Sequence, residues 1–189
     1  MTSAIRPTLT MLLLLSALFG LAYPMISTLL VQAMFTDRVE ASLMKGTNNE
    51  VLGSSLIGQP FSDPRYFWGR LSAAQYNAAA STGSNLGSAN PALLENVKAR
   101  IAALKNADPE NTQPIPVDLV TASASGLDPE ISVAAAHYQL SRVAKARGVD
   151  EHRVREAIER CTSHRQFGIL GEPRVNVLMV NLLLDGKIE

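Results

Sequence analysis

The chain has 189 residues, and its 17 Lys and Arg balance its 17 Asp and Glu, so the formal net charge at pH 7 is zero. This balance argues against nucleic acid as the main partner, because phosphate binding needs an excess of basic residues. The single Cys excludes an intramolecular disulfide and any metal site rich in Cys.

A long apolar segment lies near the start of the chain, since residues 7–36 carry no charge. Residues 9–31 are its most apolar part, and about 23 helical residues span about 35 Å, enough to cross a bilayer core of about 30 Å. We therefore predict a transmembrane helix over 9–31, preceded by a short tail over 1–8. The alternative is a cleaved signal peptide with a cleavage site after Ala22, although the apolar run continues past that residue.

The charges beside this segment predict its orientation. Arg6 precedes it without a neighbouring acid, whereas the opposite charges of Asp37 and Arg38 follow it. The positive-inside rule then places the tail in the cytoplasm and residues 37–189 outside.

Small residues on one face of the predicted helix indicate a packing surface. Ser16 and Gly20 are four positions apart, which allows another helix to approach closely. Pro24 interrupts the hydrogen-bond ladder, and neighbouring helices often compensate for such a break in lipid. A lone anchor with tolerated small residues is the alternative.

The outer domain begins with a strand signal and an aromatic segment. Residues 50–60 predict a short strand that ends at Pro60, and five of the ten aromatic residues of the chain follow within 61–76. These aromatic side chains belong to the core or form a patch for a partner. For the second interpretation, Tyr66, Phe67 and Trp68 are the candidate contact residues.

A polar loop over residues 81–91 follows. Its glycines resemble a phosphate-binding loop only superficially, because they match neither GxGxxG nor GxxxxGK[ST]. We name Ser84, Asn85 and Asn90 as candidate partner contacts, with a solvated turn as the alternative.

Three helices with clear N-caps are predicted in the rest of the chain. Asn90, Ser132 and Asp150 precede apolar stripes at helical spacing and are residue types that cap helices. Residues 114–127 are ambiguous between a strand and a helical turn.

The last element is predicted from an apolar run that follows Pro173. Its spacing from Val175 to Leu183 fits a helix that Gly186 ends, and a buried strand is the alternative. Together the elements predict the α+β class: one N-terminal transmembrane helix, then a single, mostly helical extracytoplasmic domain with a small β component.

No pattern in the chain indicates catalysis or a metal site. His137, His152 and His164 lack the i, i+4 spacing of a zinc-binding helix, and Cys161 is predicted to be a small core residue. We therefore predict no catalytic residue, no metal ligand and no enzymatic activity of the chain by itself.

Several stretches closely resemble the C subunit of the Kdp potassium-transporting ATPase, the KdpC family. They are GSSLIGQPF (53–61), YF…RxSA…YN (66–77), SxGSNLGxxNP (81–91), IPVDLVTAS (115–123), SGLDPxIS (125–132), QxxRVAxARG (139–148) and GEPRVNVLxxN (171–181). With the leading helix, the resemblance covers nearly the whole chain. It departs from the family pattern at Leu71, where the family has Pro, and at Glu130, where it has His.

The resemblance implies a non-catalytic helper subunit of a high-affinity, ATP-driven potassium-uptake complex in the plasma (inner) membrane of a bacterium. The implied partners are a channel-like potassium-binding subunit, a P-type ATPase subunit and a further small membrane subunit, besides membrane lipid. The family is described as a catalytic chaperone that raises the affinity of the pump subunit for ATP.

The family also implies that the chain binds ATP, with Gln139 as the contact and Arg142 beside it, while potassium is the transported ion. The alternative for Gln139 is a partly buried amide that bonds to the backbone. Alternatives for the whole chain are a membrane-anchored extracytoplasmic binding module without a pump partner and, more remotely, an enzyme of the cell envelope.

Overall fold

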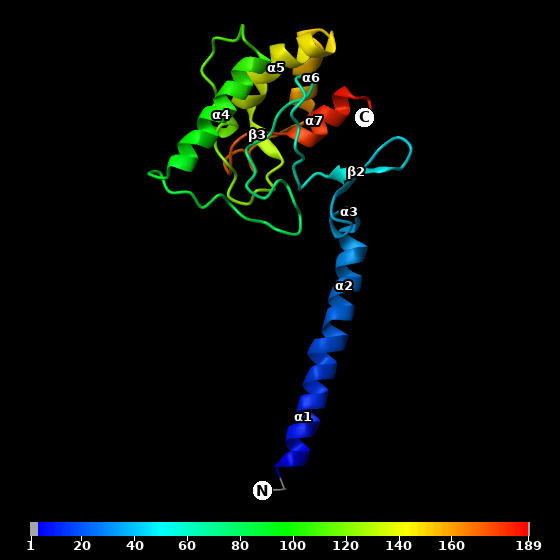
Figure 1. The fold of residues 1–189 in the computed structure, drawn as a ribbon. Helices are drawn as coiled ribbons and strands as arrows, with labels where there is room; N and C mark the ends of the chain where they lie inside the picture. Colours follow the sequence, from blue (N-terminus) through cyan, green and yellow to red (C-terminus); the bar gives the residue numbers. More distant parts are fainter. Residues whose placement is uncertain (1–3, 189) are drawn as a thin grey trace. The chain divides into compact units, whose positions relative to one another are not determined.

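The computed structural model describes residues 4–188 and divides the chain between Ser42 and Leu43 into two units. The first unit is helical almost throughout (Figure 1). Its elements are α1 (Ile5–Ala17), the π-helical segment η1 (Leu18–Ala22), α2 (Tyr23–Met34) and the short α3 (Thr36–Val39). Residues Ile5–Met34 form a helix that is long and apolar enough to cross a membrane, and no part of its most apolar stretch is buried. The predicted helix is therefore present, and its membrane limits at 9–31 stay a prediction.

The wide turn η1 has a local cause in Pro24. Proline has no N–H to donate, and its ring collides with the carbonyl four residues earlier, which here belongs to Gly20. A π-helical turn of Leu18–Ala22 precedes the proline and relieves this collision without breaking the helix. Ser27 lies in the next turn and donates its hydroxyl to the Pro24 carbonyl at 3.1 Å.

The second unit contains two small antiparallel sheets. β1 (Leu43–Lys45) pairs with β2 (Val51–Ser54). β2 confirms the strand predicted within 50–60, but it ends at Ser54 and not at Pro60. In the other sheet, β5 (Arg174–Asn176) lies between β3 (Glu130–Ser132) and β4 (Thr162–Ser163). Most of the residues of this unit that lie in helices or strands lie in helices. The unit therefore confirms the predicted α+β class.

The three predicted N-caps are confirmed. Asn90 accepts a hydrogen bond from the Ala92 N–H at 3.0 Å and begins α4 (Pro91–Ala107). Ser132 accepts from the Ala135 N–H at 3.0 Å and begins α5 (Val133–Arg147). Asp150 accepts from the His152 N–H at 2.6 Å and begins α6 (Glu151–Arg160).

The C-terminal run is a strand followed by a helix, so the prediction of one helix from Val175 was wrong at its start. Residues Arg174–Asn176 pair with both β3 and β4, and α7 covers only Val177–Leu184. Asn176 causes the switch, because its side chain accepts from the Met179 N–H at 3.0 Å as the N-cap of α7. The ambiguous stretch 114–127 contains a single 3₁₀ turn, η2 (Val117–Leu119).

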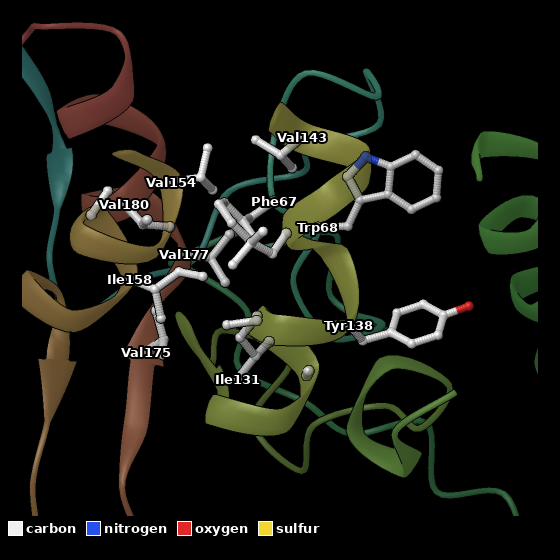
Figure 2. Packing of buried hydrophobic residues seen from close by; sticks show 14 of the residues in the cluster. Phe67, Trp68, Ile131, Tyr138, Val143, Val154, Ile158, Val175, Val177 and Val180 are labelled. Atoms are coloured by element: carbon white, nitrogen blue, oxygen red, sulfur yellow. The ribbon is translucent and has the colours of Figure 1, made fainter. Parts of the chain in front are cut away.

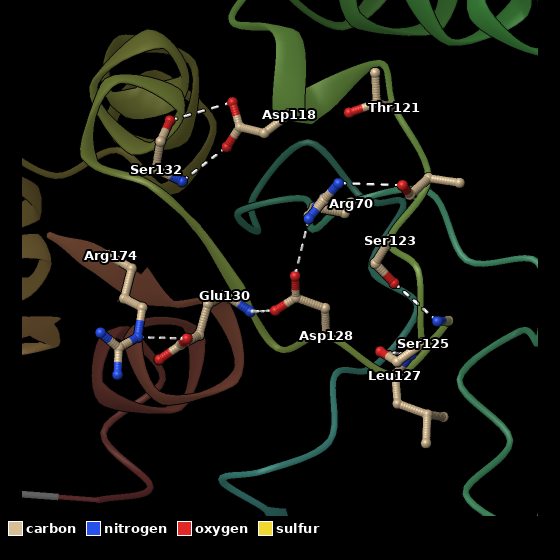
Figure 3. Close-up of polar contacts among 12 residues, drawn as sticks. Arg70, Asp118, Thr121, Ser123, Ser125, Leu127, Asp128, Glu130, Ser132 and Arg174 are labelled. Atoms are coloured by element: carbon tan, nitrogen blue, oxygen red, sulfur yellow. Dashed lines mark hydrogen bonds and ion pairs between the residues drawn. The ribbon is translucent and has the colours of Figure 1, made fainter. Parts of the chain in front are cut away.

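Polar contacts fix the loops that surround the three-stranded sheet (Figure 3). Asp118 in η2 accepts from both the N–H and the hydroxyl of Ser132, at 2.7 and 3.1 Å. Arg174 on β5 donates to Glu130 on β3 at 2.6 Å. The Glu130 carboxylate thus joins β3 to β5.

One hydrophobic cluster fills the second unit (Figure 2). It combines α5, α6 and α7 with the sheet and with the aromatic segment 61–76. Its largest fully buried side chains include Phe67, Leu104, Leu119, Val143 and Ile158. The segment 61–76 has no helix and no strand in the structure, and its one bridge to another segment joins Leu71 to Ala122. Side chains of other elements satisfy the backbone of Phe67 and Trp68.

Candidate functional site

The structure brings four of the predicted site residues together in the interior of the second unit. Gln139 and Arg142 lie on α5, and Phe67 and Trp68 lie on the aromatic segment, all at most 6 % exposed. Phe67 and Trp68 therefore belong to the core, as the first of the two interpretations predicted. In Figure 2 Phe67 lies in the middle of the labelled cluster, whereas the Trp68 indole points away from it.

The Gln139 amide holds the backbone of Trp68. Its oxygen accepts from the Trp68 N–H at 2.9 Å, and its nitrogen donates to the Trp68 carbonyl at 3.1 Å and to the Ala135 carbonyl at 3.3 Å. The oxygen also accepts from Arg142 at 2.6 Å. Because a Gln amide offers two donor hydrogens and two acceptor positions, the protein occupies all four. A direct nucleotide contact by Gln139 would require these bonds to break, and it stays a prediction.

Arg142 fixes the residues just before Trp68. Its guanidinium donates to the Tyr66 carbonyl at 3.1 Å and to the Pro64 carbonyl, and it lies 4.8 Å from the centre of the Trp68 ring. Burial lowers the pKa of this guanidinium to about 10, which leaves it protonated at neutral pH. The cation is stabilised by carbonyl oxygens and an aromatic face instead of a carboxylate.

Asn181 on α7 forms a second clamp that the sequence analysis missed. Its oxygen accepts from the Phe67 N–H at 2.8 Å, and its nitrogen donates to the Phe67 carbonyl at 3.0 Å. Gln139 and Asn181 thus bind successive residues from two different helices and replace the strand partner that this segment lacks. A polar residue four positions after Val177, on the buried face of an apolar helix, was the available signal.

Tyr66 is the one of the three predicted aromatic contacts that reaches the surface. Its hydroxyl donates to Asp185 at 3.2 Å, and burial is the main cause that raises the pKa of this phenol. Arg147 lies 5.0 Å from the centre of the ring and pairs with the same carboxylate at 2.8 Å. The half-buried ring of Tyr66 already contacts Arg65, Arg147 and the Phe61 ring, and its contact with a partner stays a prediction.

The polar loop forms one wall of a cleft of about 380 Å³ next to α4. Ser84 lines this cleft and is exposed, and Asn85 is exposed in a left-handed conformation with φ 52°. The Asn90 side chain is already engaged as the N-cap of α4. Of the three predicted loop contacts, Asn90 thus serves as a helix cap, while Ser84 and Asn85 stay predicted contacts with exposed side chains.

Ser16 and Gly20 lie in the first unit, separate from the residues above. Both are exposed, and a Cβ added at Gly20 would meet no atom within 4 Å. The surface on which close helix approach is predicted is therefore open in this unit.

The thiol of Cys161 is buried at the end of α6, and burial raises its pKa to about 11. A thiol that stays protonated at neutral pH is a poor nucleophile. Within residues 4–188, no three His, Cys, Asp or Glu residues are grouped so that they could hold a metal ion.

Comparison with known proteins gives a consistent result. The family described as "KdpC: K+-transporting ATPase, c chain" matches residues 5–186. A protein of Sorangium cellulosum named "Potassium-transporting ATPase KdpC subunit" is 56 % identical over 189 residues, which are 98 % of this chain and 99 % of the relative. Proteins with the same name from Burkholderia cenocepacia and Herpetosiphon aurantiacus are each 56 % identical over 188 residues, 98 % of this chain and 97 % of each relative.

Proposed function

The chain belongs to the KdpC family of K+-transporting ATPase c chains, and on this basis we propose that it is a non-catalytic helper subunit of an ATP-driven potassium-uptake complex. The observation that carries the proposal is the extent of the likeness. The match over residues 5–186 includes the apolar helix and the folded unit that follows it. Both parts therefore take part in the proposed role.

The helper is anchored in the plasma membrane by one helix. In this proposal residues 1–8 lie in the cytoplasm, residues 9–31 cross the bilayer, and residues 37–189 form a domain outside. The 30-residue helix Ile5–Met34 supports the crossing, and Arg6 on its N-terminal side supports the orientation.

The partners are the channel-like potassium-binding subunit and the P-type ATPase subunit of the complex, with a further small membrane subunit. Ser16 and Gly20 serve as the packing face in the membrane. Replacing both with Leu should release the companions in mild detergent, whereas Ala22→Leu adds bulk more than about 100° from both residues on the helix and should not. Full recovery of the companions by the double variant would contradict this part.

The proposal includes the catalytic-chaperone role described for the family, and it assigns that role to the segment around Trp68. Gln139 and Arg142 support the ATP affinity of the pump subunit by holding residues 64–68 in place, and they do not themselves contact the nucleotide. Their occupied hydrogen-bonding groups support this assignment. A photo-reactive ATP analogue tests it, because a direct contact predicts labelling of this chain that Gln139→Met removes and Asn181→Leu preserves.

A pull-down from native membranes tests the proposed function as a whole. The full chain carries a C-terminal tag, the membranes are dissolved in mild detergent, and the companions are identified by mass. We expect a large channel-like chain and a P-type ATPase chain in amounts comparable with the tagged chain. A chain that comes down alone would overturn the helper function and favour an anchored binding module.

A further inference from the structure

An exposed apolar turn extends from the sheet between β4 and β5. Phe167 is 91 % exposed, Ile169 is 75 % exposed and Leu170 is 55 % exposed. All residues from 163 to 172 are exposed, and Cβ atoms added at Gly168 or Gly171 would meet nothing within 4 Å. Single exposed apolar residues are common, but three within four residues indicate an interaction site.

The turn is well defined although it lacks neighbours. Gln166 and Leu170 exchange two backbone hydrogen bonds of 2.9 Å each, and the N–H of Ile169 also donates to the Gln166 carbonyl at 3.2 Å. Phe167 has a φ of 53°, which is an unfavourable conformation for an aromatic residue. The chain thus holds its most exposed aromatic side chain at the apex of a preformed hairpin, and preformed loops lose less entropy when they bind.

The charges around this turn favour a protein pocket over a lipid surface. Arg165 donates to both carboxylate oxygens of Glu172, at 2.8 and 2.6 Å. This pair makes the rim of the turn neutral, whereas apolar segments that insert among anionic lipids are flanked by unpaired basic residues. Apolar anchors inside a polar, neutral rim are typical of protein–protein interfaces.

We propose that the 166–170 turn inserts Phe167 and Ile169 into an apolar pocket on another subunit of the potassium-uptake complex. The inference rests on the proposed function, which supplies the companion subunit. The turn is convex and presents only three apolar side chains, so the pocket is small, concave and lined by apolar residues.

Photo-crosslinking in native membranes tests which class of partner covers the turn. A benzophenone-bearing phenylalanine replaces Phe167 in the full chain, and the complex is irradiated before it is dissolved. We expect an adduct with the channel-like or the P-type companion, identified by mass. Adducts with lipid alone, or no adduct, would overturn the proposal.

Substitutions give a second, independent readout. Phe167→Asp should lower the recovery of the companions at least about tenfold, as expected for an interface hot spot. Val117→Asp is the matched control, because Val117 is 71 % exposed at the start of η2, away from the turn in sequence, and its recovery should equal that of the unchanged chain. Unfolding of the Phe167→Asp chain, followed by the fluorescence of Trp68, should be unaltered, since the turn packs against nothing.

The outcomes separate the two proposals. Companions that bind the unchanged chain and the Phe167→Asp variant equally well would overturn the role of the turn and leave the helper function standing. An unchanged chain that brings down no companion would overturn the helper function, and this inference with it.

Discussion

Replacing the two buried amides should reveal how the segment around Phe67 and Trp68 is held. Gln139→Met removes the partners of the Trp68 N–H and carbonyl, and Asn181→Leu does the same for Phe67. A buried polar group without a partner costs about 1–3 kcal/mol, so two such groups cost about 2–6 kcal/mol in each variant. A domain of this size has a total stability of about 5–15 kcal/mol, so either change removes a large part of it.

Urea unfolding of the full chain in detergent measures this loss. Trp68 is the single tryptophan of the chain, and its fluorescence therefore reports directly on the clamped segment. At an m-value of about 2 kcal/mol per M, a loss of about 4 kcal/mol lowers the urea midpoint by about 2 M. The matched control is Gln113→Met, because the Gln113 side chain is exposed. This substitution should change the free energy of unfolding by less than about 0.5 kcal/mol.

The pair of variants also separates structure from nucleotide binding. If Gln139 acts only by holding Trp68, Gln139→Met and Asn181→Leu should lower the potassium-dependent ATPase activity of the complex in parallel with their loss of stability. A Gln139→Met chain that unfolds within about 0.5 kcal/mol of the unchanged chain would refute the clamp. So would a selective effect of this variant on ATP affinity at equal stability.

Two substitutions and two measurements on Cys161 test other parts of the domain. Asp118→Ala should cost about 1–2 kcal/mol in urea unfolding, because it releases the N–H and hydroxyl of Ser132 at the start of α5. Alkylation of Cys161, whose pKa burial raises to about 11, should be negligible at pH 8 and appear with unfolding. Because the folded state keeps this thiol proton longer than the unfolded state, the free energy of unfolding should fall as pH rises from about 9 to about 11. Gly58→Ala should cost about 1–3 kcal/mol, since the added Cβ would collide with the Tyr76 ring.

The parts of the fold that depend on neighbouring residues could be predicted from the sequence. Each predicted cap at Asn90, Ser132 and Asp150 involves a side chain and a backbone N–H two or three residues later, so the relevant information is local. The apolar helix was predictable for the same reason, since length and composition suffice to identify it.

The parts that depend on distant pairing could not be predicted. Arg174–Asn176 continues the apolar spacing of the helix that follows. Its backbone nevertheless forms a strand, because it pairs with β3 (130–132) and β4 (162–163). The Asn181 clamp joins residues 114 positions apart. A single sequence does not show which distant residues are in contact. The cap Asn176, which ends the strand and begins α7, could have been recognised from its residue type.

The distribution of polar groups in the domain indicates where its function resides. The buried amides of Gln139 and Asn181 and the buried cation of Arg142 are all engaged with the backbone of one irregular segment. Such groups specify a shape, because breaking any of their bonds leaves a buried polar atom without a partner. The surface turn at Phe167 has the opposite character, since its apolar side chains contribute nothing to the core. This division fits the proposed helper role, because the buried polar groups fix the shape of the domain and leave the exposed turn free for the proposed contact.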